Sequence, residues 1–258
     1  VGIGGAPDAS DFGDYGADTL GNIVNACAAG LANRDRQGKL QLPNLKKLGI
    51  FAAHAEANSN RYSGCSGKNS NASYASATEI SRGKDTPSGH WELAGVPVSW
   101  DWKYFKDKEK SFPEDAIRQI MKTCNLNRIL ANCHASGIEI IREFGEKHVR
   151  TLDPIFYTSV DSVVQIACHE EHFGLKKLYD LCEESAKIFH PMMVGRIIAR
   201  PFIGNDKDSF YRTNNRKDYT IPPPNPTVCE LLTRNGGACH AIGKISDIFA
   251  KKGISTSV

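Results

Sequence analysis

The sequence predicts an α/β protein in which one domain is interrupted by a second, inserted domain. Segments with helical spacing of apolar residues alternate with short apolar segments typical of strands. A charged, aromatic run, KYFKDKEKSF, begins after Trp102, and a proline-stiffened connector, IPPPNP, occupies residues 221–226. We therefore expect three segments: a first domain part in 1–97, an insertion in 98–221, and a return to the first domain in 222–258.

The first part is expected to contain two helices and a long loop. Residues 17–32, ADTLGNIVNACAAGLA, have apolar residues at helical spacing, and Asp18 suits the helix N-terminus. A short helix is expected in PNLKKLG. Residues 58–81 are rich in Ser and Asn, which predicts a loop, and long loops in compact domains are often functional.

The stretch GKDTPSGHWELAG places one hydroxyl, that of Thr86, among residues typical of turns and helix starts. Thr86 suits the N-cap, Pro87 the N1 position, and Gly95 the end of a short helix. Free N–H groups and the positive helix dipole favour an anion at such an N-terminus, so a phosphate on Thr86 would be stabilised there, with Lys84 balancing its charge. Ordinary capping explains the same residues and stays open as the alternative.

Within the insertion, helices are expected in PEDAIRQIMKTC (with Pro113 at N1), SGIEIIREFGEKH and GLKKLYDLCEESAKIF, and strands in PIFYTS, SVVQIAC and VGRIIARPF. TVCELLTRNG and CHAIG predict a further helix and strand after the connector. NCHASG is interpreted as a loop and helix cap. In CHEEHF, His169 and His172 are three residues apart, not four as in zinc-protease helices, which favours a hydrogen-bonding or solvated pair over a metal site.

Composition excludes several classes of partner. A net charge of +3 without a long basic run argues against nucleic acid, and no apolar run is long enough to span a membrane. The eight cysteines form no CxxC pair, which suits free thiols in a reducing cytoplasm and predicts no disulfide-linked partner. The first residue is Val1 rather than Met, so we expect a processed or truncated start.

Seven segments, in this order, resemble phosphopentomutases: VGIGGAPDA, GADTLGNI, GKDTPSGHWELAGVPV, FYTSVDSVVQIACHEEHFGL, GRIIARPFIG, YRTNNRKDY and GKISDIFAKKGI. The resemblance covers essentially the whole chain. It implies an alkaline-phosphatase-like core with an inserted α/β cap domain. It also implies interconversion of ribose or deoxyribose 1-phosphate and 5-phosphate through a bisphosphate intermediate, with two divalent cations, usually manganese. The phosphoryl carrier of that family is the threonine of GKDT, here Thr86.

The resemblance also implies which parts of the family the chain lacks. A threonine hydroxyl is a poor nucleophile at neutral pH, so a phosphothreonine cycle needs metal ions. The family's metal ligands lie before the GIGGAPDA glycines and after GKISDI, so we assign no metal ligand to any residue here. We expect a chain with an incomplete core that lacks the family's N-terminal start and its C-terminal metal-binding part, and that is inactive alone.

Pentose phosphate is the expected partner, and its binding residues are implied by the same resemblance. Arg196 and Arg212 match arginines that hold the distal phosphate, Asp161 matches the residue that faces the sugar, and Ile198 packs beside it. Lys244 is a weaker candidate for a polar contact near the core site, and Lys84 is a possible partner for the charge of the phosphate. On residue types alone, each arginine could form a surface ion pair and Asp161 could belong to a turn or a helix N-cap. Lys244 could simply face solvent.

Two other functions remain open from the sequence. A metal-dependent phosphohydrolase or a phosphoglycerate mutase of the same superfamily would share the metal and hydroxyl chemistry. The chain as it stands could also be an inactive fragment that binds sugar phosphates.

Overall fold

The computed structural model describes residues 2–5, 9–58, 70–83 and 85–258. They form two compact units, Val1–Glu79 and Ile80–Val258. Lys84 and much of the serine- and asparagine-rich stretch lie outside the described residues. The boundaries predicted near 98 and 221 stay a prediction. Across the described residues, every helix is too short or too polar to serve as a membrane span.

The first unit is helical where it is described. It contains a 3₁₀ turn, η1 (Ala9–Phe12), and the helices α1 (Thr19–Ala28), α2 (Pro43–Lys47) and α3 (Ile50–Ala57). The predictions of α1 and α2 are confirmed, whereas α3 was not predicted. One Asp18 oxygen accepts the Gly21 N–H at 2.9 Å, and the other lies 2.7 Å from Nε2 of His54 on α3. Asp18 therefore caps α1 and ties it to α3.

The second unit is built on a mixed sheet. Its strands are β1 (Leu130–His134), β2 (Ile155–Thr158), β3 (Val163–His169), β4 (Arg196–Ile203), β5 (Tyr211–Arg212) and β6 (Lys217–Thr220). The order is β1-β2-β3-β4-β5, and β6 also pairs with β4. β1 with β2 and β3 with β4 are parallel, and the other pairs are antiparallel. The three strands predicted in the insertion are confirmed as β2, β3 and β4.

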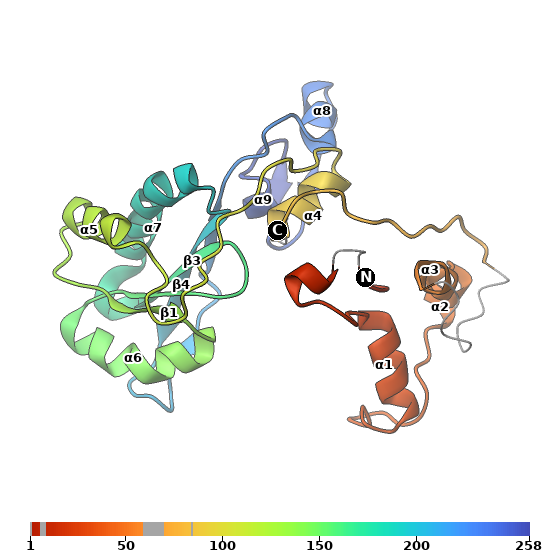
Figure 1. The fold of residues 1–258 in the computed structure, drawn as a ribbon, viewed down its shortest axis with the longest axis horizontal. Coiled ribbons are helices and arrows are strands. Elements are labelled where there is room, and N and C mark those ends of the chain that lie inside the picture. Colours follow the sequence, from red (N-terminus) through yellow and green to blue (C-terminus); the bar gives the residue numbers. More distant parts are fainter. Residues whose placement is uncertain (1, 6–8, 59–69, 84) are drawn as a thin grey trace. The chain divides into compact units, whose positions relative to one another are not determined.

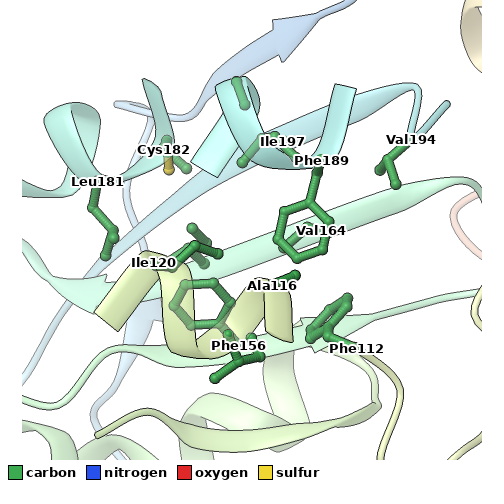
Figure 2. Close-up of a cluster of buried hydrophobic side chains, with 14 of the residues drawn as sticks. Phe112, Ala116, Ile120, Phe156, Val164, Leu181, Cys182, Phe189, Val194 and Ile197 are labelled. Carbon is green, nitrogen blue, oxygen red and sulfur yellow. The ribbon is translucent and has the colours of Figure 1, made fainter. Parts of the chain in front are cut away.

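Helices cover both faces of this sheet (Figure 1). The predicted helices α5 (Glu114–Thr123) and α7 (Leu175–Phe189) pack on one face, and α6 (Gly137–Thr151) packs on the other. Alternation along β2 divides the core, because Phe156 joins the α5 and α7 side, whereas Ile155 and Tyr157 join the α6 side. Figure 2 shows Phe156 and Val164 of the sheet facing Ile120 of α5. Each face of the sheet therefore carries an apolar core, as expected for an α/β unit.

A separate apolar core joins two segments that are far apart in the sequence. It combines the end of α4 (Thr86–Leu93) and the chain that follows it with α9 (Ile245–Ile248). Trp91 and Trp102 pack here with Ile248, and Trp91 Nε1 donates to the Ile248 carbonyl at 3.0 Å. The predicted helix and strand after the connector are α8 (Val228–Arg234) and β7 (His240–Ala241), and β7 pairs with β8 (Thr256–Ser257).

Two local interpretations were wrong. NCHASG is not wholly loop, because its first residues belong to β1. Ala131 and Asn132 have φ values of 66° and 84°, and the β1–β2 register shifts between Ala131 and Cys133. This irregular strand lacks the alternation by which a strand is predicted. Pro113 occupies the N-cap of α5 rather than N1.

The histidines of CHEEHF lie where β3 meets a short π-helix, η2 (Glu170–Gly174). The His169 and His172 ring centroids are 4.5 Å apart. His169 Nε2 donates to the Gly204 carbonyl at 2.9 Å, and Nδ1 accepts the N–H groups of Glu171 and His172 at 3.3 Å. His169 is thus a hydrogen-bonding histidine, as the spacing predicts.

A buried histidine, His148, joins α6 to β3. Its Nδ1–H donates to the Asp153 carbonyl at 2.7 Å, and its Nε2 accepts the His169 N–H at 2.8 Å. The second bond requires the neutral ring, because a protonated Nε2 could not accept it. Burial lowers the pKa of His148 from 6.5 to about 4.

We predict that this histidine makes the second unit less stable in mild acid. Between pH 6.5 and about 4, His148 binds a proton in the unfolded chain but not in the folded chain. The folded state therefore loses stability as the pH falls. The free energy of unfolding of the wild type should fall by about 2 to 3 kcal/mol more than that of His148→Gln between pH 7.5 and 4.5. Urea unfolding followed by tryptophan fluorescence measures this, since all three tryptophans lie in the second unit. Parallel pH profiles would contradict it.

Candidate functional site

A cavity of about 330 Å³ opens on the α6 side of the sheet, beyond the start of that helix. Residues two apart along β4 point to the same face, so Arg196, Ile198 and Arg200 all line the cavity. Gly137, the first residue of α6, lines the cavity as well. Five of the residues selected from the sequence line this cavity, namely Thr86, Asp161, Arg196, Ile198 and Lys244. We call it the Thr86 cavity.

The sixth described candidate, Arg212, lies elsewhere. It is an exposed residue of β5 and lines a neighbouring cavity of about 560 Å³. Arg200 and Arg216 line both cavities. The structure therefore brings Arg212 to an adjoining space rather than into the Thr86 cavity itself.

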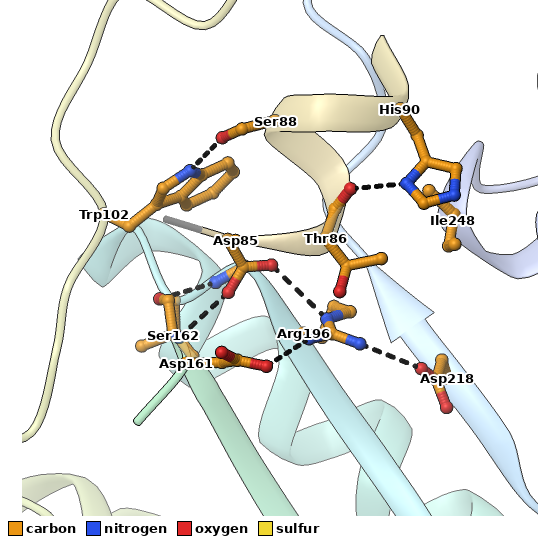
Figure 3. A network of polar contacts seen from close by, with 12 residues as sticks. Asp85, Thr86, Ser88, His90, Trp102, Asp161, Ser162, Arg196, Asp218 and Ile248 are labelled. Atoms are coloured by element: carbon orange, nitrogen blue, oxygen red, sulfur yellow. Dashed lines mark hydrogen bonds and ion pairs between the residues drawn. The ribbon is translucent and has the colours of Figure 1, made fainter. Parts of the chain in front are cut away.

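Thr86 is the first residue of α4, one position later in the capping scheme than the sequence predicted. The N-cap is Asp85, whose backbone is extended (φ −150°, ψ 156°), and Pro87 follows Thr86 in the first turn. The Thr86 carbonyl accepts a hydrogen bond from Nδ1 of His90 at 2.8 Å. Figure 3 shows the Thr86 side chain directed towards the guanidinium of Arg196, which lines the same cavity.

Arg196 is the centre of a buried ionic cluster (Figure 3). Its side chain is 4% exposed and faces three carboxylates. Nε lies 3.4 Å from Asp85, Nη2 lies 3.3 Å from Asp161, and Nη1 lies 3.5 Å from Asp218. A buried guanidinium needs such partners, because an unpaired charge is costly in the interior. Arg196 thus connects the start of α4, the turn before β3 and strand β6.

Asp85 holds the Thr86 helix against the sheet. Its side chain is 0% exposed, and Oδ2 accepts the N–H of Ser162 at 2.9 Å. Burial raises its pKa from 3.8 to about 6, with Arg196 opposing this shift and the charge of Asp161 adding to it. Local sequence indicates only a turn-forming residue at Asp85, because its partners are distant along the chain.

Ser162 links these groups to the backbone on either side. Its hydroxyl donates to the Lys103 carbonyl at 2.7 Å and accepts the N–H of Gly195 at 3.1 Å. A Cβ added to Gly195 would lie 3.4 Å from Oδ1 of Asp85, so the carboxylate is packed closely against β4. Through Ser162, the residue before Thr86 is thus tied to the backbone at Lys103 and at Gly195.

Three further polar residues of the site were missed in the sequence. Arg216 forms two 2.7 Å contacts with Asp218, one to each oxygen. Arg200 donates through Nε to Oε1 of Gln165 at 2.9 Å. Gln165 pairs with Ile198 across β3 and β4, which puts it on the cavity face. The spacing of Arg196 and Arg200 along a predicted strand is the one signal that could have identified Arg200.

Comparison with curated proteins shows which family the chain resembles. No family model matches the chain. The chain is 55% identical to a phosphopentomutase of Idiomarina loihiensis over 258 residues, which is 100% of this chain and 63% of that protein. It is 51% identical to phosphopentomutases of Allorhizobium ampelinum and Pectobacterium atrosepticum, again over 100% of the chain and 64% of each relative. These 258 residues are similar over their whole length to part of the phosphopentomutases.

The family resemblance read from the motifs is thereby confirmed, and the chain spans less than two thirds of the length of these phosphopentomutases.

The part of the chain that the structure describes has no group of three or more His, Cys, Asp or Glu side chains that could hold a metal ion. Asp85, Asp161 and Asp218 do converge, but on the guanidinium of Arg196, which occupies the place that a cation would need. These carboxylates therefore do not fit a metal centre.

We predict that the buried charge of Asp85 weakens the fold at neutral pH. Its folded pKa of about 6 lies above the ordinary 3.8, so the stability that its protonation contributes is present below 3.8 and is lost as the pH rises through 6. On going from pH 8 to pH 4, the wild type should gain about 2 to 3 kcal/mol more stability than Asp85→Asn. Urea unfolding at both pH values measures this. An equal response in both proteins would show that Asp85 is ionised as freely as in the unfolded chain.

Proposed function

We propose that the whole protein is a phosphopentomutase that interconverts ribose or deoxyribose 1-phosphate and 5-phosphate in the cytoplasm. The observation that carries the proposal is the Thr86 cavity of this family member, in which a hydroxyl at a helix start faces Arg196 and shares the space with Lys244. Cations around a hydroxyl are what phosphoryl transfer requires, because negative charge on the transferring group must be stabilised.

In the proposed cycle Thr86 carries the phosphoryl group. Phosphothreonine gives its phosphoryl group to the free hydroxyl of a pentose monophosphate; the Thr86 oxygen leaves with the bonding electron pair and takes up the proton that the attacking hydroxyl loses. The resulting bisphosphate then gives its other phosphoryl group to Thr86, which restores phosphothreonine and releases the isomeric monophosphate. Two divalent cations, manganese foremost, belong to the proposal. Among the described residues, no group of three or more His, Cys, Asp or Glu side chains could hold either cation.

The sugar phosphate is proposed to lie between Thr86 and the arginines. Asp161 reaches the cavity with a partly exposed carboxylate that can accept from a sugar hydroxyl, and Ile198 provides an apolar surface beside it. Lys244 directly precedes α9, and its positive charge also lines the Thr86 cavity. Each of these contacts fixes the orientation of the reacting phosphate.

The distal phosphate is proposed to be held by Arg196 and Arg212, but the two differ in availability. Arg196 already faces three carboxylates. It would therefore position Asp161 through their ion pair in addition to any direct contact with the phosphate. Arg212 is exposed and makes no ion pair with the other described residues. Arg212 therefore has the freer guanidinium for a phosphate.

The domain arrangement completes the proposal. An alkaline-phosphatase-like core is proposed for segments 1–97 and 222–258, with 98–221 as the inserted cap. Two observations support it: the sheet and its helices have their own apolar cores, and α4 shares a different core with α9. A hydrolase or a phosphoglycerate mutase of the same superfamily is less well supported, since the curated relatives compared above are all phosphopentomutases.

We predict that the whole protein becomes phosphorylated on Thr86. After incubation with ribose 1,5-bisphosphate, peptide mapping should locate one phosphate on this residue, and Thr86→Ala should abolish both phosphorylation and mutase activity because no other hydroxyl occupies its position. Thr123→Ala changes an exposed threonine at the end of α5 and serves as the matched control. Mutase activity of Thr86→Ala near that of the control would refute the assignment. Release of inorganic phosphate without isomerisation would favour the hydrolase.

A further inference from the structure

Two half-buried cysteines, Cys229 and Cys239, lie side by side in the second unit. Cys229 belongs to the first turn of α8, and Cys239 directly precedes β7. Both are free thiols, and the Cys239 sulfur is a hydrogen-bond partner of the Cys229 thiol. Neither residue lines the Thr86 cavity. The structure thus brings together two nucleophilic groups that the proposed reaction does not use.

Backbone contacts hold the two cysteines against the same short segment. A Cβ added to Gly253 would lie 2.6 Å from the carbonyl carbon of Cys229, so the chain at Gly253 runs directly against the first turn of α8. Ser255 exchanges two hydrogen bonds with Cys239. Its N–H donates to the Cys239 carbonyl at 2.8 Å, and its hydroxyl accepts the Cys239 N–H at 3.1 Å. Because two residues of chain span at most about 7 Å, this segment fixes both cysteines close to one another.

Exposure distinguishes this pair from another pair of neighbouring cysteines. Cys168 of β3 and Cys182 of α7 also lie near one another, but both are 0% exposed. Such buried thiols are inert, because oxidants and reductants do not reach them. Cys229 and Cys239 are partly exposed, so a small reagent can reach them. An accessible thiol beside a second thiol is the arrangement that allows reversible oxidation.

We propose that Cys229 and Cys239 form a modification site, at which a hydroperoxide converts the two thiols into an intramolecular disulfide that a thiol reductant reverses. The disulfide would bond the first turn of α8 to the residue before β7. The chain that follows β7 leads to Lys244 in the Thr86 cavity, but the site does not depend on the phosphoryl chemistry.

The oxidation takes place in two steps. One sulfur attacks an oxygen of the hydroperoxide, the O–O bond breaks, and the other oxygen leaves as an alcohol or water with the proton that the thiol loses. The second sulfur then attacks the resulting sulfenic acid, the S–O bond breaks, and the hydroxyl group leaves as water with the proton of the second thiol. The two sulfurs together lose two electrons, and the hydroperoxide gains them.

The test maps the disulfide in the whole protein. The folded protein is treated with hydrogen peroxide, the remaining thiols are blocked with N-ethylmaleimide, and tryptic peptides are analysed by mass spectrometry. Trypsin cleaves after Arg234, so the two cysteines fall in separate peptides, 218–234 and 235–244. We expect a joined species that is lighter by two hydrogens than the sum of the two reduced peptides. Dithiothreitol should separate it.

Cys229→Ser and Cys239→Ser should each lose the joined species. Cys124→Ser is the matched control, because it removes a half-buried thiol at the end of α5, and it should yield as much joined species as the wild type. Circular dichroism verifies that each protein stays folded during the oxidation.

Full alkylation of both cysteines in the folded wild type after peroxide treatment would overturn the proposal. So would a joined species that forms only in urea, or a sulfinic acid on either cysteine in place of the joined species. Both of these outcomes would show that the folded chain keeps the two sulfurs apart.

Discussion

The arrangement of the site depends on one buried guanidinium, that of Arg196. Its carboxylate partners come from the start of α4, the turn before β3 and strand β6, so a single side chain holds together three segments that are distant in sequence. Removing it would leave Asp85 and Asp218 buried without their shared counter-charge, which in other proteins costs about 3 to 5 kcal/mol. Thr86 follows Asp85 directly, so its placement in the cavity is a consequence of this cluster.

The structure of the sheet explains why polar groups gather in the Thr86 cavity. One face is covered by α5 and α7 and carries an extended apolar core, as expected of strands buried between layers. The other face is apolar only beneath α6. Because α6 begins at Gly137, the side chains of Gln165 and Arg200 on the uncovered part of that face line the cavity instead of a core. The position of one helix start thus separates the apolar and the functional halves of the same surface.

Much of the second unit could be predicted from the sequence, because its helices and strands have clear periodicity. Thr86 could be assigned to a helix start from its neighbours alone. Strand β1 could not be predicted, since two left-handed residues, Ala131 and Asn132, interrupt it. Nor could the role of Asp85, whose bonded partner Ser162 is 77 residues away. Ionic clusters of this kind are set by tertiary packing, which local patterns of residue type do not encode. The roles assigned to the site residues remain predictions.

A double-mutant cycle between Asp85 and Arg196 tests the account most directly. Asp85→Asn, Arg196→Gln and the double variant would each be unfolded in urea at pH 8, with tryptophan fluorescence as the probe. If Arg196 organises the cluster, the effects of the two changes should be strongly non-additive, with a coupling energy of about 1 to 3 kcal/mol. Additive effects, with a coupling energy below about 0.5 kcal/mol, would show that the two charges are neighbours without being partners and would contradict the account.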